Sequence, residues 1–390
     1  MALLDGVVAL GSTLAAPRPV PVPNPRPATP FVTVDLGRVA ALYDRLAEAL
    51  PGVGLYYAVK ANPAPAVLGT LAAYGARWDV ASPGEIDAVL RADADPGHLS
   101  YGNPVKKAAD IRHAHARGVR RFAVDSEEEL DKLVRHAQGA TLLVRLATSG
   151  AGADWSLSGK FGCEEREAGR LLARAVGSGH PVGVCFHVGS QQRDVRAWEA
   201  PLTATARLRR LVRALGRDLE VVDIGGGFPA ELDGGPLPSL SAYGAAIRSA
   251  LRRFLGPDLP EIAAEPGRAL VADAGVLESE VVLVTHRAGA RWVYLDVGLF
   301  SGLAETMDEA VRYRLTALRD GLPLAGQVGE VVLAGPTCDS ADVLYRHRRP
   351  VLPLGLAPGD RVLLHGAGAY TTTYSSVGFN GFAPLREVHR

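Results

Sequence analysis

Short apolar runs, each followed by a helical stretch, recur from residue 31 to residue 275 and constrain the fold more than any other feature. Eight of them are typical of buried strands: LYYAVKA (55–61), RWDVAS (77–82), HLSYGN (98–103), RRFAVDS (120–126), TLLVRLA (141–147), VGVCFHVG (182–189), EVVDIGGG (220–227) and EIAAEPGR (261–268). Intervening segments such as 63–76 and 126–138 carry apolar residues at helical spacing. This alternation predicts an α/β fold, a (β/α)8 barrel over residues 31–275.

The rhythm changes after residue 275. Strand-like runs at 276–287, 291–298, 326–336 and 359–370 are separated by turns, and one helix-like stretch, LAETMDEAVRYRL, spans 303–315. We therefore expect a C-terminal β domain over residues 276–390. Residues 1–30 are expected to form a short N-terminal segment and an extended connector, because residues 17–30 read PRPVPVPNPRPATP.

Composition narrows the class of partner. Lys and Arg together number 42, and so do Asp and Glu, so the chain has no basic footprint for nucleic acid or anionic membrane. No uncharged apolar run reaches the roughly 18 residues that a membrane span needs. Three scattered cysteines fit neither a disulfide scaffold nor a metal site, and suit a reducing cytoplasm. The expected partner is a small metabolite.

Polar residues collect at the carboxyl ends of the expected barrel strands. In a barrel these ends surround one mouth, where catalytic groups lie. The residues concerned are Lys60, Asp79, Arg145, His187, Ser190, Gly225, Gly226, Gly227, Glu265 and Arg268.

Lys60 directly follows the apolar residues of the first strand. One interpretation is a lysine that leaves the strand end and reaches solvent. The other is a desolvated amine whose pKa is lowered, so that it can condense with an aldehyde.

The glycines at 225–227 form a tight turn or a phosphate cradle, since backbone N–H groups can approach an oxyanion closely there. Arg268 can add a bidentate phosphate contact. Pyridoxal phosphate requires such a set: an amine for its aldehyde, donors for its phosphate, and an acid such as Glu265 for its ring nitrogen. His187 is then either a structural histidine or a residue that stacks on the cofactor ring.

Six motifs occur in a characteristic order: YAVKANP, FHVGSQ, DIGGGFP, EPGR, GPTCDSADVL and GAYTTTYSSVGFNGF. From about residue 31 to the C-terminus the chain resembles the fold-type III pyridoxal-phosphate-dependent amino-acid decarboxylases, whose barrel is alanine racemase-like. YGNPVKK, CDSADVL and FNGF are similar to the ornithine decarboxylases within that group.

The resemblance implies roles for individual residues. Lys60 would bond the cofactor aldehyde, His187 would stack on the ring, and Glu265 would face the pyridine nitrogen. Phosphate contacts would come from Ser190, Gly225, Gly226, Gly227, Arg268 and Tyr370, with Asp79 and Arg145 near the cofactor. In a homodimer with shared active sites, the partner subunit would supply Cys338 as a catalytic acid and Asp339 as a contact for the substrate's distal amine. Glu309, or its neighbour Asp308, would also bind the substrate, and Phe379 would line the pocket.

The implied reaction is decarboxylation of a basic amino acid, with L-ornithine giving putrescine for polyamine biosynthesis. Lysine, diaminopimelate, a carrier-linked substrate or another diamino acid are alternatives. A racemase is less expected, because alanine racemases usually keep an arginine at the pyridine nitrogen, where EPGR supplies Glu265. A non-catalytic binder resembling the antizyme inhibitors is also less expected, since Lys60, Glu265 and Cys338 are all present.

Overall fold

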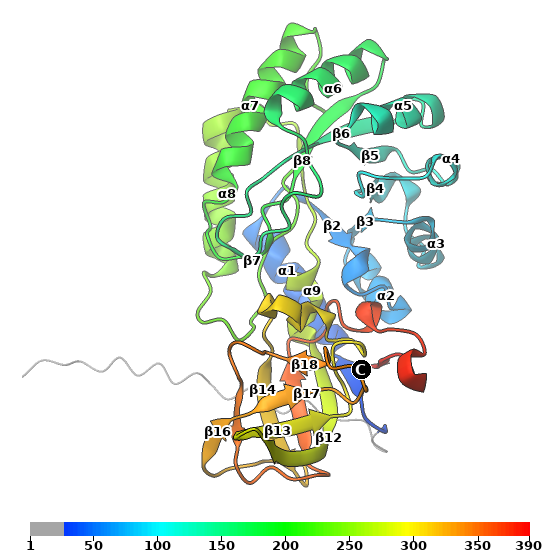
Figure 1. Ribbon diagram of the computed structural model, residues 1–390. Coiled ribbons are helices and arrows are strands. Elements are labelled where there is room, and N and C mark those ends of the chain that lie inside the picture. Colours follow the sequence, from blue (N-terminus) through cyan, green and yellow to red (C-terminus); the bar gives the residue numbers. More distant parts are fainter. Residues whose placement is uncertain (1–26) are drawn as a thin grey trace, which may run out of the picture.

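Two bodies of secondary structure make up the chain, a barrel ringed by helices and a sheet domain packed at one end of it (Figure 1). The computed structural model describes residues 27–390. The N-terminal segment and most of the proline-rich connector therefore lie outside the described residues. In the described part no helix is both long enough and apolar enough to cross a membrane.

The barrel is closed and parallel, in the order β10-β11-β2-β3-β4-β5-β6-β8, with β8 bonded back to β10. Its strands are β2 (Gly54–Ala58), β3 (Arg77–Val80), β4 (Leu99–Tyr101), β5 (Arg121–Val124), β6 (Thr141–Leu146), β8 (Val182–Phe186), β10 (Val221–Asp223) and β11 (Glu261–Ala264). Each lies in one of the eight runs identified from the sequence, except that β2 begins one residue before its run, so the predicted barrel is confirmed.

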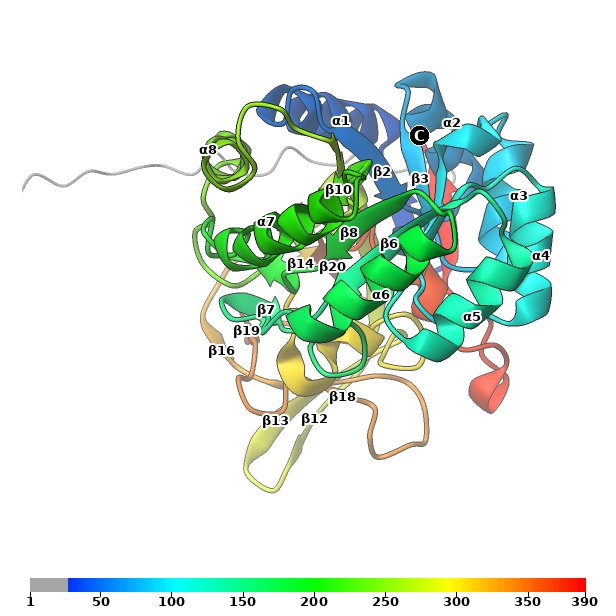
Figure 2. The ribbon, with the colours of Figure 1, turned by 90° about the horizontal axis from the view of Figure 1, so that it is seen from above.

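Helices surround the barrel, as the view from above shows (Figure 2). They are α1 (Leu36–Ala49), α2 (Pro65–Ala73), α3 (Pro83–Arg91), α4 (Ala108–Ala116), α5 (Glu127–His136), α6 (Glu165–Gly177), α7 (Glu199–Ala214), α8 (Leu240–Leu255) and the short α9 (Arg268–Val271). Helix α5 shows how the sequence sets an element: the Ser126 hydroxyl accepts from the Glu129 N–H at 3.3 Å, and Glu127, Glu128 and Glu129 occupy the first turn.

Alternation along the strands separates two sets of buried side chains. One set packs the strands against the helices and includes Tyr57, Trp78 and Phe122. A smaller cluster comprises Tyr56, Ala123, Leu143, Cys185, Val221 and Ala263, one from each of six barrel strands. These residues fill the barrel interior, so the floor beneath the mouth is packed rather than open.

The second body is a nine-stranded sheet. It contains β1 (Phe31–Val34), β12 (Gly275–Arg287), β13 (Ala290–Leu295), β14 (Arg314–Arg319), β15 (Leu322–Pro323), β17 (Val332–Ala334), β18 (Val343–Leu344), β20 (Arg361–His365) and β21 (Arg386–His389). A separate pair joins β16 (Val328–Glu330) to β19 (Val351–Pro353). The expected C-terminal β domain is therefore present.

Strand β1 does not belong to the barrel, although the barrel was expected to span residues 31–275. It precedes the barrel in the chain, yet it pairs antiparallel with β12 and parallel with β21. The sheet domain thus takes strands from both ends of the described chain. Nothing in the local sequence of residues 31–34 distinguishes this pairing from a barrel strand, because the partners are more than 200 residues away.

The helix expected over residues 303–315 is wrong. The segment forms a short 3-10 turn, η4 (Ala304–Glu309), and enters β14 soon after. Asp308 and Glu309 have φ of 55° and 58°, in the left-handed region that a right-handed helix cannot include. Buried ion pairs of Glu305 and Glu309, described below, outweigh the helical periodicity of this stretch.

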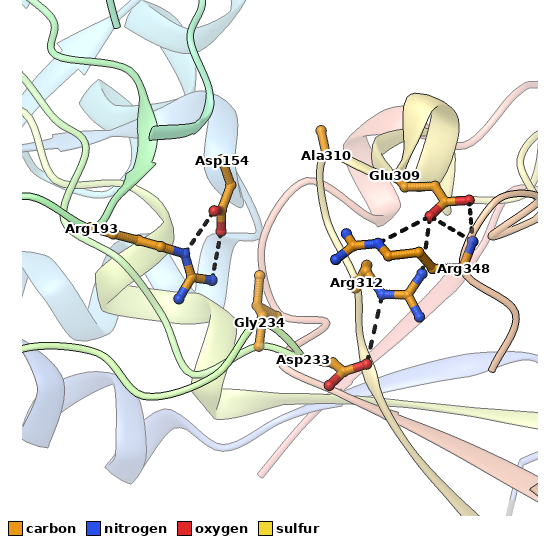
Figure 3. A pocket seen from close by; sticks show the side chains of 9 residues that line it. Asp154, Arg193, Asp233, Gly234, Glu309, Ala310, Arg312 and Arg348 are labelled. Carbon is orange, nitrogen blue, oxygen red and sulfur yellow. Dashed lines mark hydrogen bonds and ion pairs between the residues drawn. The ribbon is translucent and has the colours of Figure 1, made fainter. Parts of the chain in front are cut away.

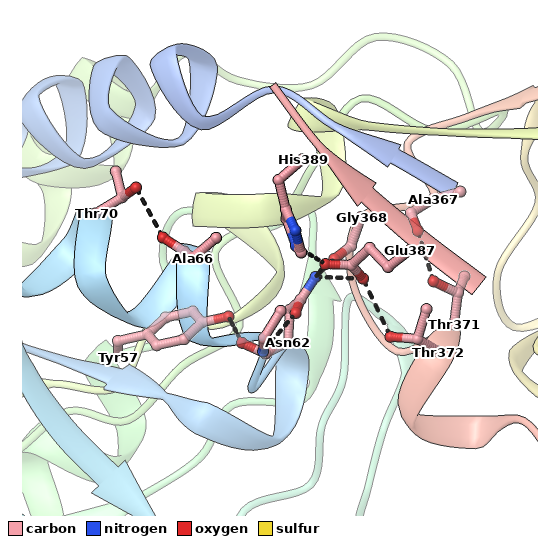
Figure 4. A network of polar contacts seen from close by, with 11 residues as sticks. Tyr57, Asn62, Ala66, Thr70, Ala367, Gly368, Thr371, Thr372, Glu387 and His389 are labelled. Atoms are coloured by element: carbon pink, nitrogen blue, oxygen red, sulfur yellow. Dashed lines mark hydrogen bonds and ion pairs between the residues drawn. The ribbon is translucent and has the colours of Figure 1, made fainter. Parts of the chain in front are cut away.

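The C-terminal strand is bonded to the chain just after β2 (Figure 4). Asn62 is 1% exposed, and its Nδ2 donates to Gly368 O at 3.1 Å and to Glu387 Oε2 at 3.0 Å. Thr372 Oγ1 also donates to Glu387, at 3.2 Å. Glu387 therefore ties the segment that follows Lys60 to β21 and to the loop that follows Tyr370.

Replacing Glu387 with alanine is expected to destabilise the protein. The buried Asn62 amide would lose a charged acceptor, a loss typically worth about 1–3 kcal/mol in the free energy of unfolding. Chemical denaturation measures it, with Glu330→Ala on the exposed face of β16 as the control. Equal stability of the two variants would contradict a supporting role for Glu387.

Candidate active site

Lys60 lies in a single 3-10 turn, η1 (Val59–Ala61), at the carboxyl end of β2. Its Nζ is 2.5 Å from Oδ2 of Asp79, which lies on neighbouring β3 and is buried, while the Lys60 side chain is 48% exposed. The exposed surface of Lys60 contributes to the wall of a pocket. Because β2 and β3 are adjacent in the barrel, the strand order brings Lys60 and Asp79 together.

Of the two interpretations of Lys60, the one in which desolvation lowers its pKa is wrong. Burial acts in that direction, but Asp79, Tyr370 and Glu265 act against it, and the pKa is raised above its usual value. The amine is therefore held as an ammonium ion by the carboxylate of Asp79. A desolvated lysine exists elsewhere: burial lowers the pKa of Lys106 to about 8 despite its ion pair with Glu129.

His187 ends the sixth barrel strand, and its imidazole is neutral. Burial, followed by the charges of Arg145 and Lys60, lowers its pKa to about 3. Nδ1 accepts a hydrogen bond from the Gly189 N–H at 3.1 Å, so the proton resides on Nε2. A neutral ring at this position can stack on a flat ligand without adding charge.

Two buried carboxyl groups lie at the ends of β10 and β11. Burial, and then the nearby carboxylates of Asp223 and Asp79, raises the pKa of Glu265 well above its usual range. Burial also raises the pKa of Asp223 to about 6, although its Oδ1 accepts from the Gly225 N–H at 2.9 Å. Glu265 thus retains a proton until a basic group, such as a ring nitrogen, is bound beside it.

The triple glycine lets the chain pass close to His187 and to the backbone of Glu265. A Cβ atom at Gly226 would lie 2.7 Å from the backbone oxygen of Glu265 and 3.0 Å from His187 Nε2, and Gly227 has φ of 102°. A side chain at 226 would therefore press on the His187 ring and on the Glu265 backbone. Its absence leaves room beside His187 for a flat ring, and the glycine backbone can approach a phosphate closely.

Arg268 and Tyr370 complete the wall. Arg268 is 4% exposed, and its guanidinium carbon lies 4.9 Å from the centre of the Tyr370 ring. Its Nη2 is 3.5 Å from Ser190 Oγ, on β9 (Ser190–Gln192). Its Nε is buried and has no hydrogen-bond partner among residues 27–390. An acceptor such as a phosphate oxygen would satisfy this donor.

One pocket thus brings together most of the predicted cofactor residues. Its lining includes Lys60, His187, Ser190, Gly226, Gly227, Glu265, Arg268 and Tyr370. Asp79 joins through Lys60, and Gly225 is adjacent in the chain. Arg145 does not line the pocket; its guanidinium carbon lies 5.5 Å from the centre of the Phe161 ring, and its charge acts on His187. The arrangement suits pyridoxal phosphate in its amine, its donors and its buried acid.

The other predicted residues lie outside this pocket, on the sheet domain. Cys338 and Asp339 are exposed, and the Cys338 N–H donates to Asn380 Oδ1 at 3.1 Å. The Phe379 ring lies 4.8 Å from that of Phe300. These contacts gather the loops near residues 300, 338 and 380 into one surface, which we call the C-terminal loop cluster.

Glu309 has a set of structural contacts rather than a free carboxylate (Figure 3). Its oxygens accept from the His347 N–H at 2.5 Å and the Arg348 N–H at 3.2 Å. It also pairs with the Arg312 guanidinium at 3.2 Å, and its side chain is 7% exposed. Asp308 beside it is exposed and forms no ion pair among the described residues.

Sequence reasoning missed two residues that organise these loops. The buried carboxylate of Asp342 accepts from the Leu299 N–H at 2.7 Å and from Thr337 Oγ1 at 2.8 Å. Glu305 forms a buried ion pair with Arg268. Asp342 belongs to the motif GPTCDSADVL, close to Cys338. Glu305 lies in the stretch that was expected to be helical, and a glutamate there would be read as a residue on the exposed face of the helix.

Comparisons with known proteins agree with this site. Residues 36–272 match the family model for the pyridoxal-dependent decarboxylase, pyridoxal binding domain.

The chain is 37% identical to the lysine/ornithine decarboxylase of Selenomonas ruminantium, over 91% of this chain and 88% of that protein. It is 32% identical to the ornithine decarboxylase of Schizosaccharomyces pombe, over 94% and 84%. The crystal structure of lysine/ornithine decarboxylase complexed with cadaverine from Vibrio vulnificus matches with a TM-score of 0.83 at 33% identity, over 93% of this chain and 94% of that one.

The fold and the pocket define an enzyme of the barrel-plus-sheet class that uses pyridoxal phosphate. The chain belongs to the pyridoxal-dependent decarboxylase family. It is a pyridoxal-phosphate-dependent amino-acid decarboxylase.

Borohydride reduction of the holoenzyme is expected to fix the cofactor on Lys60. Tryptic mass spectrometry would locate the pyridoxyl adduct, and Lys60→Ala would carry none. Lys106 is the informative rival, because it has the lowered pKa but is fully buried among backbone carbonyls. An adduct on Lys106 would show that amine basicity, and not position at the pocket, selects the site.

Proposed function

We propose that this enzyme decarboxylates a basic amino acid, with L-ornithine giving putrescine and CO2. The observation that carries the proposal is a pair of exposed carboxylates on the sheet domain, Asp308 and Asp339, which form no ion pair among residues 27–390. The substrate's distal ammonium is the charge they would bind. Lysine, giving cadaverine, is the second candidate, because the Selenomonas relative is named for both substrates.

The pocket residues would divide the chemistry among them. The cofactor supplies a ring that draws electrons from the carbon that loses CO2. Lys60 would bond the cofactor aldehyde, and Asp79 would orient its amine at the pocket wall. Neutral His187 would cover one face of the ring, and Glu265 would share its proton with the ring nitrogen. The phosphate would lie on Ser190, Gly225–Gly227, Arg268 and Tyr370.

Of the two acids considered for the substrate's tail, Asp308 is the better supported. Glu309 already accepts from two backbone N–H groups and an arginine, so binding a substrate would cost those contacts. Asp308 carries no such cost. Its backbone has φ of 55°, a left-handed conformation that aspartate tolerates better than most residues.

Shared sites in a homodimer would complete the pocket. The C-terminal loop cluster carries the proposed acid Cys338 and substrate contact Asp339, yet none of it lines the pocket of its own chain. It also exposes apolar side chains: Val377 is 87% exposed, Phe379 37% and Phe382 41%. A second copy that covered this surface would bring Cys338 to a neighbouring pocket, where its thiol could protonate the substrate carbon.

The three free cysteines suit an enzyme of the reducing cytoplasm. Putrescine as the product suits a role in polyamine biosynthesis.

Asp308→Asn and Asp339→Asn are expected to lower kcat/KM for ornithine at least about tenfold, because each leaves the bound cation with one carboxylate fewer. Release of CO2 from ornithine, lysine and neutral norvaline measures the effect. Norvaline turnover, if detectable, would change little. Equal losses on ornithine and norvaline would mean that these acids support the fold instead of binding the tail, and a wild-type preference for norvaline would refute the proposed substrate class.

Mixing Lys60→Ala with Cys338→Ala subunits is expected to restore activity. Random exchange in equal amounts makes half of the dimers hybrid, with one intact site each, so activity would reach about a quarter of the wild-type value. Native mass spectrometry would verify exchange. Hybrid dimers without activity would refute site sharing.

A further inference from the structure

Arg268 and Glu305 form a buried ion pair across the boundary between the barrel and the sheet domain. Arg268 begins α9 at the end of the last barrel strand, and Glu305 lies in η4 of the sheet domain. Nη1 donates to Oε2 at 2.8 Å and Nη2 donates to Oε1 at 2.7 Å. The side chains are 4% and 3% exposed. The pair is bidentate and fully removed from solvent.

Glu305 accepts hydrogen bonds from both terminal nitrogens of Arg268, which are the donors that an arginine normally presents to a phosphate. Of the guanidinium nitrogens of Arg268, only Nε has no hydrogen-bond partner among residues 27–390, since Nη2 is also 3.5 Å from Ser190 Oγ. The Tyr370 ring, 4.9 Å away, covers the guanidinium face. Glu305, Tyr370 and Ser190 therefore hold the guanidinium from three sides beside the pocket.

Two effects of Glu305 on a bound phosphate oppose each other. Its negative charge reduces the attraction that Arg268 offers to a dianion. Its two hydrogen bonds fix the orientation of Arg268, and without them a buried guanidinium would have to turn toward other acceptors. Both carboxylate oxygens of Glu305 accept from Arg268 and from no other residue in the range 27–390, so the carboxylate has no competing structural role there.

We propose that Glu305 is a positioning residue for the cofactor phosphate: it holds Arg268 from across the domain boundary, so that phosphate binding in the barrel depends on the sheet domain. Orientation of the donor outweighs the charge that Glu305 adds. The inference concerns the cofactor and does not depend on which amino acid is the substrate.

The test compares the apoprotein's affinities for pyridoxal phosphate and for pyridoxal, which lacks the phosphate. Fluorescence titration of the full-length chain gives both dissociation constants. The variants are Glu305→Ala, Glu305→Gln and the control Asp360→Asn. Asp360 also receives two bonds from one arginine, Arg319, at 2.8 and 2.7 Å within the sheet domain, but does not line the pocket.

Glu305→Ala is expected to weaken pyridoxal phosphate binding about tenfold or more, the usual scale for hydrogen bonds to charged groups. Pyridoxal binding would change less than about twofold, since the aldehyde and ring contacts remain. Glu305→Gln would fall between, because its amide oxygen still accepts from one terminal nitrogen. Asp360→Asn would leave both affinities unchanged.

Three results would overturn the proposal. Tighter pyridoxal phosphate binding by both Glu305 variants would mean that charge outweighs orientation. Equal weakening for the two ligands would indicate a general effect on the fold, as would a comparable loss in Asp360→Asn. If Glu305→Ala does not fold, the isosteric Glu305→Gln decides: selective weakening of pyridoxal phosphate supports positioning, and unchanged or tighter binding refutes it.

Discussion

Closure of the parallel barrel by the hydrogen bonds between β8 and β10 is the constraint on which the site depends. Closure brings residues from distant parts of the chain, such as Lys60, His187 and Glu265, to one mouth. It also keeps their charged groups near one another in a partly desolvated space. The opposite pKa shifts of Lys60 and His187 follow from this crowding: Asp79, Tyr370 and Glu265 hold a proton on the Lys60 amine, whereas burial and the positive charges of Arg145 and Lys60 exclude one from the His187 imidazole.

The barrel could be predicted because its signal is local. Parallel strands are covered on both faces, so each has the sequence of a short apolar run. Helix starts are also recognisable, as in α5, where Ser126 caps the helix and glutamates follow in its first turn. The polar residues at strand ends then follow from topology alone. This is why Lys60, His187, Glu265 and Arg268 could be assigned to one pocket before any coordinates.

What could not be predicted depends on partners far away in the chain. Strand β1 looks like any other strand, and only β12 and β21 decide its sheet. The helical spacing of residues 303–315 is overridden by the bonds of Glu305 to Arg268 and of Glu309 to Arg312 and the backbone at 347–348. The raised pKa of Lys60 also depends on a distant residue, because its carboxylate partner Asp79 belongs to another strand. Local pattern cannot register such pairs.

The two anchors of η4 have a consequence for how the exposed surface of this turn can change. Glu305 fixes one end of the turn by its ion pair with Arg268, and Glu309 fixes the other by its ion pair with Arg312. Between them Met307 and Asp308 remain exposed, with Met307 55% exposed. The side chain of Met307 can therefore be exchanged while the backbone on either side stays in place, and position 308, with φ of 55°, is best filled by aspartate, asparagine or glycine. A turn held at both ends lets the surface between its anchors change while Arg268 and the pocket that it lines stay in place.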